Sequence, residues 1–280
     1  MKRIATIQDL SCVGKCSLGI AMPILSAMGI ECAALPTAVL SAHTAFDGFV
    51  CTDLTAQLAP IAAHWKALGL RFDALYTGYL ASPAQVAFVE AFFDSFGRAD
   101  TLVFVDPVMA DQGRLYAGFD AGFPEKMRRL CARADIVTPN VTEACLLTGM
   151  EYRELHEESY LRELLEGLIS FGPRTAIITG VRSDDGRMGV VAMDAGGKLS
   201  GHWTEYIPAV FHGTGDLFAS TCVGLLTLGW STAGAIRLAS EYVVQTLRAT
   251  VRDRDARWYG VDFETTLPLL LSKLEKKEDI

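Results

Sequence analysis

Residues 102–108 read Leu-Val-Phe-Val-Asp-Pro-Val, and this stretch decides the fold. The unbroken apolar run Leu102–Val105 is typical of a strand that is buried on both faces, as in a parallel sheet. Helical patterns lie on either side of it, from Pro83 to Phe96 and from about Gly122 to Ala132. Because helices that alternate with strands imply crossovers between parallel neighbours, the sequence predicts an α/β protein.

The same alternation continues along most of the chain. Short apolar runs predict further strands at Ile4–Ile7, Glu31–Leu35, Phe72–Thr77, Asp135–Val137 and Thr175–Thr179, and a hairpin at Met188–Met193 and Lys198–Tyr206. Helices are expected at Leu18–Met28, Leu54–Leu68, Thr142–Leu147, Glu154–Ile169, 216–228, 232–250 and 264–275, and irregular loops at Pro36–Asp47 and Arg114–Gly122. We therefore expect a single three-layer domain over residues 1–280. Its mostly parallel sheet carries helices on both faces, and residues 265–280 form a C-terminal helix and tail.

Composition excludes several classes of protein. The chain is 50% hydrophobic and has a formal net charge of −8 without a basic stretch, so we expect no nucleic-acid partner. Nowhere do about 18 apolar residues run uninterrupted, and the first apolar run is too short for a signal peptide, so no membrane partner is expected. Seven cysteines without a tight framework indicate free thiols in a reducing compartment, and hence a cytoplasmic location.

Polar residues follow the predicted strands at one edge of the sheet. Ligands of open α/β sheets bind beyond the carboxyl ends of the strands. The residues at these ends are Gln8-Asp9, Thr77-Gly78-Tyr79, Asp106-Pro107, Thr138-Pro139-Asn140 with Glu143 one turn on, and Thr179-Gly180. They predict a polar cleft, in which Asp106 and Glu143 are candidate ligands, through water, for Mg²⁺ on nucleotide phosphates. Spacing alone equally allows turn and helix-end roles for both acids.

The sharpest local feature is His212-Gly213-Thr214-Gly215-Asp216, which precedes an apolar, helix-forming run. Glycines let the backbone approach an anion closely, and the free N–H groups of the new helix point at it. This arrangement suits a phosphoryl group in transfer, and Asp216 can accept the proton of an attacking hydroxyl. The helix dipole is expected to lower the pKa of Asp216. Simple capping of the helix by Thr214 or Asp216 is the alternative.

Common nucleotide and hydrolase motifs are absent from the sequence. Gly14-Lys15-Cys16-Ser17 matches only the end of a phosphate-binding loop, because the leading glycine is missing and Cys16 stands at the Ser/Thr position. No Gly-x-Gly-x-x-Gly follows the first strand, and no Gly-x-Ser-x-Gly occurs. The dinucleotide-binding and hydrolase interpretations are therefore weak.

In combination, the remaining motifs resemble the ribokinase-like superfamily and, within it, the pyridoxal/pyridoxamine kinases of vitamin B6 salvage. Gly213–Asp216 resembles the anion hole and base of the superfamily. The segments that resemble the B6 kinases, in the same order, are Ser41-Ala42-His43-Thr44, Thr77-Gly78-Tyr79, Asp106-Pro107-Val108-Met109 and Thr138-Pro139-Asn140-Val141-Thr142-Glu143. The resemblance covers nearly the whole chain, from Ile4 to about Ala249.

The resemblance implies ATP-dependent phosphorylation of the 5′-hydroxymethyl group of pyridoxal, pyridoxine or pyridoxamine by a homodimer, with Mg²⁺ and a monovalent cation, K⁺ or Na⁺. The implied roles are catalysis for Asp216, Gly213, Thr214 and Gly215; substrate binding for Asp9, Thr44, Tyr79 and Asp216; nucleotide binding for Asn140, Glu143, Thr179, Thr214 and Gly215; and metal binding for Asp106 and Glu143. Thr138 and Thr179 would lie near the monovalent cation or a phosphate. A hydroxymethylpyrimidine or sugar kinase of the same superfamily, and a non-catalytic B6-binding sensor, remain open as alternatives.

Two positions depart from the family pattern. Asp9 stands where the family often has a serine after Ile-Gln in the first strand, and a carboxylate there can pair with the charged aminomethyl group of pyridoxamine. Some bacterial relatives carry a lid cysteine in a Gly-x-Gly-Cys motif, where this chain has Asp216. We therefore expect a preference for pyridoxamine and no covalent adduct of pyridoxal at residue 216.

Overall fold

Within residues 1–275, which the computed structural model describes, nine strands form one central sheet in the order β11-β10-β9-β8-β5-β4-β1-β2-β3. The strands are β1 (Arg3–Ser11), β2 (Glu31–Leu40), β3 (Cys51–Asp53), β4 (Ala74–Thr77), β5 (Leu102–Val105), β8 (Ile136–Val137), β9 (Thr175–Arg182), β10 (Arg187–Asp194) and β11 (Leu199–Glu205). Pairing is parallel from β2 to β9 and antiparallel at both ends of the sheet. A separate small hairpin consists of β6 (Ala110–Asp111) and β7 (Arg114–Leu115).

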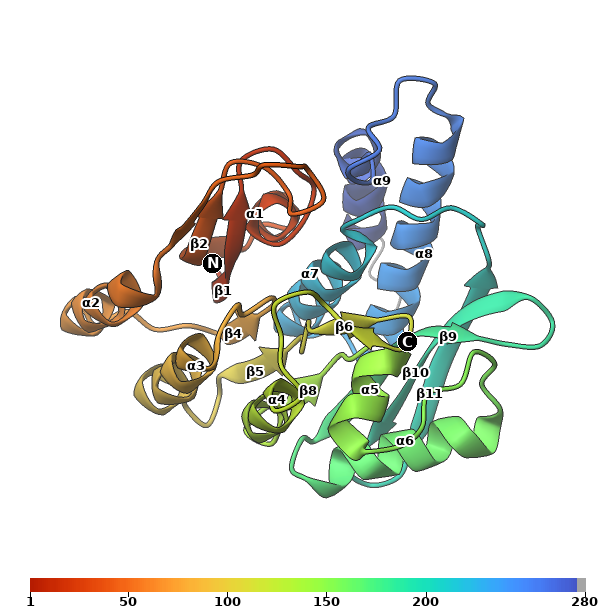
Figure 1. The fold of residues 1–280 in the computed structure, drawn as a ribbon, viewed down its shortest axis with the longest axis horizontal. Helices are drawn as coiled ribbons and strands as arrows, with labels where there is room; N and C mark the ends of the chain where they lie inside the picture. The colour runs from red at the N-terminus through yellow and green to blue at the C-terminus, as the bar shows by residue number, and fades with distance from the viewer. Residues whose placement is uncertain (276–280) are drawn as a thin grey trace.

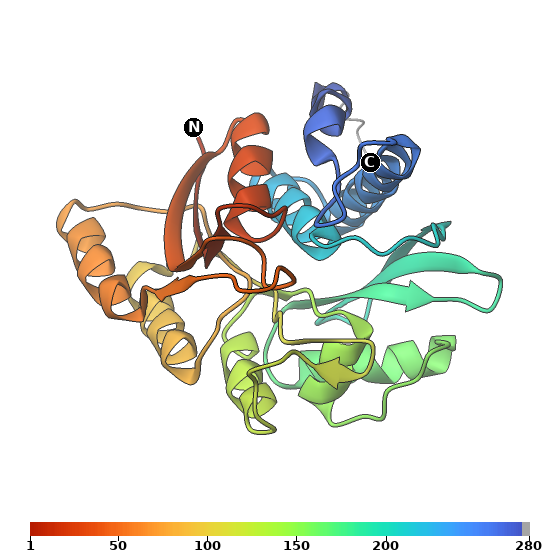
Figure 2. The ribbon, with the colours of Figure 1, turned by 45° about the horizontal axis from the view of Figure 1, so that its top comes forward.

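Helices cover both faces of the sheet, as predicted (Figure 1). One face carries α1 (Leu18–Ala27), α7 (Thr214–Thr227), α8 (Thr232–Arg252) and α9 (Phe263–Glu275). The other carries α2 (Thr55–Ala67), α3 (Pro83–Phe96), α4 (Phe123–Cys131), α5 (Val141–Thr148) and α6 (Glu158–Ser170). Figure 2 shows the sheet running between these two layers. The predicted α/β class and mostly parallel sheet are confirmed.

Two hydrophobic cores lie on opposite faces of the sheet. Val103 and Val105 of β5 enter the core beneath α2–α6, whereas Phe104 enters the core beneath α1, α7 and α8. Successive side chains of a strand point to opposite faces, so both cores need apolar residues from the same strand. This requirement explains the unbroken apolar run in the sequence of β5.

The prediction was wrong about where β1 and β2 end. Gln8 and Asp9 lie inside β1, and residues 36–40 continue β2 where an irregular loop was expected. Polar side chains suggested a loop there. Beyond the end of β4, however, β1 still pairs with β2, and β2 pairs with β3, so the backbone groups of these residues are hydrogen-bonded. The register of β1 on β2 shifts between Gln8 and Leu10, and such a bulge redirects the side chain that it contains.

Smaller differences concern other element ends. Helix α6 begins at Glu158 rather than Glu154, and β7 interrupts the expected irregular segment 114–122. The predicted C-terminal helix is α9, and residues 276–280 of the predicted tail lie outside the described residues. All seven cysteines are free thiols, as expected. Among the described helices, none combines the length and the apolar character needed to cross a membrane.

Candidate active site

The carboxyl ends of the central strands lie side by side at one edge of the sheet. The backbone N–H of Asp106 donates to the carbonyl of Thr77 at 3.0 Å, and the N–H of Thr138 donates to the carbonyl of Val105 at 3.0 Å. These two bonds join β4 to β5 and β5 to β8 directly after the last residue of each strand. The predicted row of polar residues along this edge therefore exists.

Several buried polar groups in this row have no hydrogen-bond partner within residues 1–275. They include the hydroxyls of Thr77 and Thr138, and the structure shows no partner for the carboxylate of Asp106, which is 7% exposed. Burial raises the pKa of Asp106 well above its ordinary value, and the charges of Glu143 and Asp216 raise it further. The three acids therefore lie near one another, and the unpartnered groups beside them are typical of a ligand or ion site. We call the region that holds them, between the start of α5 and the start of α7, the crevice.

On one side of the crevice, Glu143 is bonded to the backbone at the start of α5. Its Oε2 accepts from the N–H of Asn140 at 2.9 Å, while its Oε1 accepts from the N–H of Met109 at 3.0 Å. Asn140 completes a capping box by accepting from the N–H of Glu143, and its amide nitrogen donates to the carbonyl of Ala110. Burial raises the pKa of Glu143 to about 8, although the hydrogen bonds from these N–H groups lower it. Thr179 of β9 forms an isolated bridge with Asn140, so both lie at this side.

On the other side, α7 begins with the glycine-rich stretch. Gly213 has φ of 85°, and a Cβ atom there would lie 2.0 Å from the carbonyl oxygen of Lys15, so the protein itself requires glycine. A Cβ atom at Gly215 would meet nothing within 4 Å. Gly215 therefore borders open space in front of the helix N-terminus, where a phosphate can approach the backbone. Thr214 is the first residue of the helix.

Asp216 is partly exposed in the first turn of α7. Burial raises its pKa to about 6, helped by the charge of Asp9 and opposed by the backbone N–H of Ser17. The backbone N–H at the helix start does lower this pKa, as expected, but the desolvation of the carboxylate outweighs it, so the pKa is raised overall. A carboxylate with this pKa is a better general base near neutral pH than an ordinary aspartate.

Of the residues expected to bind substrate, Asp9 lies near Asp216, whose pKa its charge raises after burial itself. Asp9 is 6% exposed, and burial raises its pKa. The hydroxyl groups of Ser17 and Ser11 lower this pKa by a smaller amount. Its charge also raises the pKa of Tyr79, so the two side chains are near each other. Thr44 lies exposed in the β2–β3 loop.

The β2–β3 loop nevertheless reaches the glycine-rich stretch. The rings of His43 and His212 lie 4.3 Å apart between centroids. Burial and the charge of His212 both lower the pKa of His43. This contact brings the segment next to Thr44 to the start of α7, as the sequence motifs suggested.

Sequence reasoning missed three residues at the crevice. Burial raises the pKa of Tyr116, and the charges of Glu143, Asp111 and Asp106 raise it further, so this residue lies near the acids. The buried hydroxyl of Tyr76 lies 3.4 Å from that of Ser220, and after burial itself the charges of Asp106 and Asp216 raise its pKa. Ser17 contributes a backbone N–H. No residue pattern marks these roles, since the first two depend on tertiary packing and the third on a backbone angle.

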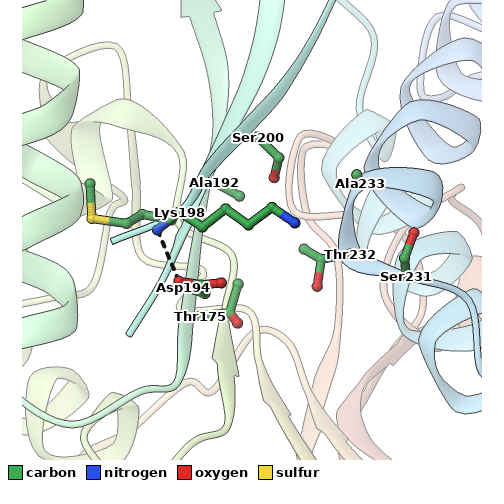
Figure 3. A pocket seen from close by; sticks show the side chains of 9 residues that line it. Thr175, Ala192, Asp194, Lys198, Ser200, Ser231, Thr232 and Ala233 are labelled. Carbon is green, nitrogen blue, oxygen red and sulfur yellow. Dashed lines mark hydrogen bonds between the residues drawn. The ribbon is translucent and has the colours of Figure 1, made fainter. Parts of the chain in front are cut away.

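A pocket of about 330 Å³ lies at the opposite edge of the sheet (Figure 3). It is lined where β9 begins, where β10 ends and where α8 begins, by Thr175, Ala192, Met193, Asp194, Lys198, Ser200, Ser231, Thr232 and Ala233. The side chain of Lys198 extends toward the N-terminus of α8. None of the predicted site residues lines this pocket, so it is not the candidate active site.

The family model described as phosphomethylpyrimidine kinase matches residues 25–257. The chain belongs to this family. A pyridoxal kinase from Rubrobacter xylanophilus is 32% identical over 271 residues, which cover 91% of this chain and 89% of the relative. The predicted resemblance and the predicted enzyme class, a phosphotransferase acting on a hydroxyl group, are confirmed.

Solved structures of family members agree with the fold. A protein from Bacteroides thetaiotaomicron, described as a phosphomethylpyrimidine kinase and crystallised with pyridoxal, is 38% identical with a TM-score of 0.92, covering 100% of this chain and 97% of its own. A pyridoxal kinase from Lactobacillus plantarum is 32% identical with a TM-score of 0.90 and covers 99% of both chains. The family fold therefore extends over the whole described chain.

Proposed function

We propose that the protein transfers the γ-phosphoryl group of ATP to the 5′-hydroxymethyl group of a vitamin B6 vitamer. The observation that carries the proposal is the placement of Asp216, behind an open helix N-terminus and facing the same crevice as Asp106 and Glu143. Relatives named pyridoxal kinase, and a family structure crystallised with pyridoxal, support a B6 vitamer as the acceptor.

In this proposal, the residues of the chain divide the work. Asp216 accepts the proton of the attacking hydroxyl, and its pKa of about 6 leaves it mostly ionised at neutral pH. The N–H groups from Gly213 to Gly215 stabilise the charge on the phosphoryl group in transfer. Asp9 and Tyr79 orient the acceptor ring, and Thr44 contacts it from the rim. Asn140 and Thr179 lie on the nucleotide side of the crevice.

The crevice also fits the expected ions. Residues 1–275 contain no cluster of three or more His, Cys, Asp or Glu side chains that could hold a metal alone. Mg²⁺ typically uses one or two carboxylates together with phosphates and water, and Asp106, which has no hydrogen-bond partner among residues 1–275, is suited to this. Glu143, with both oxygens bonded to backbone, would act through water. When bound, Mg²⁺ would neutralise phosphate charge. The unpartnered hydroxyl of Thr138 supports a monovalent cation nearby.

A substrate panel tests the proposal directly. The purified protein is assayed with ATP and Mg²⁺ against pyridoxal, pyridoxine, pyridoxamine, hydroxymethylpyrimidine and ribose, and products are identified by mass spectrometry. We expect the highest kcat/KM with a B6 vitamer and no turnover when Mg²⁺ is chelated. A preference for hydroxymethylpyrimidine or ribose would instead favour a sister kinase. Binding of B6 without any transfer would favour a sensor.

Asp9 is proposed to select pyridoxamine among the vitamers. Its side chain is buried near Tyr79 and Asp216, where a charged aminomethyl group would offset the cost of burying the carboxylate. Asp9→Ser should therefore lower the ratio of kcat/KM for pyridoxamine to that for pyridoxal. An unchanged ratio would remove Asp9 from the selection of substrate.

We further propose that the enzyme is a cytoplasmic homodimer with one site in each subunit. The seven free cysteines are compatible with a reducing compartment. Size-exclusion chromatography with light scattering tests the oligomeric state, and a monomer at assay concentration would contradict the proposal.

A further inference from the structure

Lys15, part of the incomplete phosphate-loop motif, is bonded away from the crevice. Its Nζ lies 2.7 Å from Oδ1 of Asp262 and 3.0 Å from Oε2 of Glu264, at the start of α9. The Lys15 side chain is 15% exposed and that of Asp262 is 10% exposed, so this pair is far better shielded than an ordinary surface ion pair. The ammonium group is therefore engaged by two carboxylates and does not serve as a phosphate-binding lysine.

The backbone around Lys15 is clamped between two segments. On one side its carbonyl oxygen would lie 2.0 Å from a Cβ atom at Gly213. On the other side its Cβ would lie 2.3 Å from a Cβ atom at Gly260 in the α8–α9 loop. Both neighbours are glycines at points where any side chain would collide with Lys15. The β1–α1 loop (residues 12–17) thus touches the anion-hole glycine directly.

Two residues after Lys15, the same loop contacts the proposed base. Ser17 has φ of 46° and ψ of −127°, an unfavourable conformation for a residue other than glycine. In this conformation its backbone N–H lies near enough to the carboxylate of Asp216 to lower the pKa of that group. Strained backbone persists only where surrounding contacts hold it. Backbone bonds of Cys12 and Val13 to the β2 side hold the start of this loop, and the Lys15 ion pairs anchor the part next to Ser17.

The α8–α9 loop also reaches the substrate side of the site. Phe46, in the β2–β3 loop that carries Thr44, packs against Trp258 at 4.6 Å and Tyr259 at 5.3 Å between ring centroids. One segment therefore contacts the β1–α1 loop through Asp262 and the substrate loop through its aromatic rings.

We propose that Lys15 is a positioning residue for phosphoryl transfer. Its ion pairs with Asp262 and Glu264 hold the β1–α1 loop against Gly213 and keep the Ser17 N–H directed at Asp216. The inference rests on the proposed function, because it takes Asp216 as the base. Displacement of reacting groups by about 1 Å commonly costs up to about 100-fold in rate. Loss of the Lys15 ion pairs should therefore lower kcat rather than substrate affinity.

The test compares Lys15→Met, Lys15→Arg and a matched control, Lys2→Met. Lys2 pairs with Asp73 at 2.9 Å on the surface, at the amino end of β1 and far from the crevice along that strand. Two readouts are used: kcat and KM for both substrates, and hydrogen exchange of the backbone measured by mass spectrometry. Hydrogen exchange does not depend on turnover, so it reports whether the Lys15 ion pairs hold the β1–α1 loop even if the substrate assignment is wrong.

We expect Lys15→Met to lower kcat about 10- to 100-fold with KM for both substrates within about threefold. Exchange should rise in peptides that cover residues 12–20 and 209–217. Lys15→Arg, which keeps the charge, should restore most of the rate, and Lys2→Met should match the wild type in both readouts.

A folded Lys15→Met variant with wild-type kcat and wild-type exchange in both segments would overturn the proposal. If that variant does not fold, Asp262→Asn, which keeps the volume of the side chain, replaces it with the same expectations and the same overturning result. A wild-type protein inactive on every acceptor would instead contradict the proposed function. Raised exchange of residues 12–20 and 209–217 in Lys15→Met would still support the role of the Lys15 ion pairs in holding the loop.

Discussion

The two sides of the crevice are built differently. The α5 side, with Asn140 and Glu143, is closed by hydrogen bonds within the protein: each carboxylate oxygen of Glu143 accepts from backbone N–H groups. The α7 side, with Gly213 to Asp216, has few such bonds, open space in front of Gly215 and a base whose carboxylate is held by a strained neighbour. The polar groups of the α5 side are therefore bonded within the protein without a ligand, whereas those of the α7 side are free to bind groups of the substrates.

This difference separates two effects of mutation. Changes on the α5 side should remove acceptors that the fold needs and therefore lower stability. Changes on the α7 side that leave the contact between Gly213 and Lys15 in place should keep the fold nearly intact and lower kcat. Four predictions test this separation, beginning with the largest effect.

Asp216→Asn should lower kcat by a factor on the order of 10²–10⁴ with nearly normal ATP binding, because it removes the proton acceptor and keeps the shape of the side chain. Steady-state kinetics with the preferred acceptor and ATP titration by calorimetry measure both. Turnover near that of the wild type would refute the role of Asp216.

Gly213→Ala and Gly215→Ala form a matched pair within one loop. Alanine at Gly213 has an unfavourable φ of 85° and collides with the backbone of Lys15, so it should destabilise the fold by about 2–4 kcal/mol. Alanine at Gly215 meets no protein atom and should keep the stability, yet lower kcat/KM for ATP about 10- to 100-fold by crowding the phosphate. Urea unfolding and kinetics separate these outcomes. Equal losses of stability in both variants would contradict the account.

The sequence predicted the layers of the fold and the row of polar residues at one edge of the sheet, but not the energetics that distinguish the α5 side from the α7 side. The apolar run of β5 and the Gly213–Asp216 stretch are local signals, readable because period and turn chemistry are local. The extension of β1 through Asp9 depends on pairing with β2 and β3, and no local pattern records it. The raised pKa of Asp216 likewise depends on burial by distant segments, which outweighed the helix dipole.

The pH dependence of activity should report the raised pKa of Asp216. The base works only when ionised, so log kcat/KM should rise with pH up to about 6 and then level off. Below that value it should fall about tenfold for each pH unit. Initial rates between pH 4.5 and roughly 8, with stability checked at each pH, measure the profile. A flat profile down to pH 4.5 would show that the carboxylate has an ordinary pKa.

The last prediction compares the stability effects of replacing the two acids proposed to serve Mg²⁺. Glu143→Ala should lower the free energy of unfolding by about 2–4 kcal/mol, because it leaves the buried N–H groups of Asn140 and Met109 without an acceptor. Asp106→Ala should change it by no more than about 1 kcal/mol, because Asp106 satisfies no donor and its ionised form is disfavoured by burial. Urea unfolding without Mg²⁺ measures both. A larger loss for Asp106→Ala would reverse the comparison.

A structure of the protein with Mg²⁺, a non-hydrolysable ATP analogue and a B6 vitamer tests the central claim most directly. We predict that the 5′-hydroxyl oxygen lies within hydrogen-bond distance of the Asp216 carboxylate, roughly 2.6–3.2 Å, with the terminal phosphate directed at the N–H groups of Gly213 to Gly215. A vitamer bound with its hydroxyl away from Asp216, or a nucleotide bound outside the crevice between α5 and α7, would contradict the account.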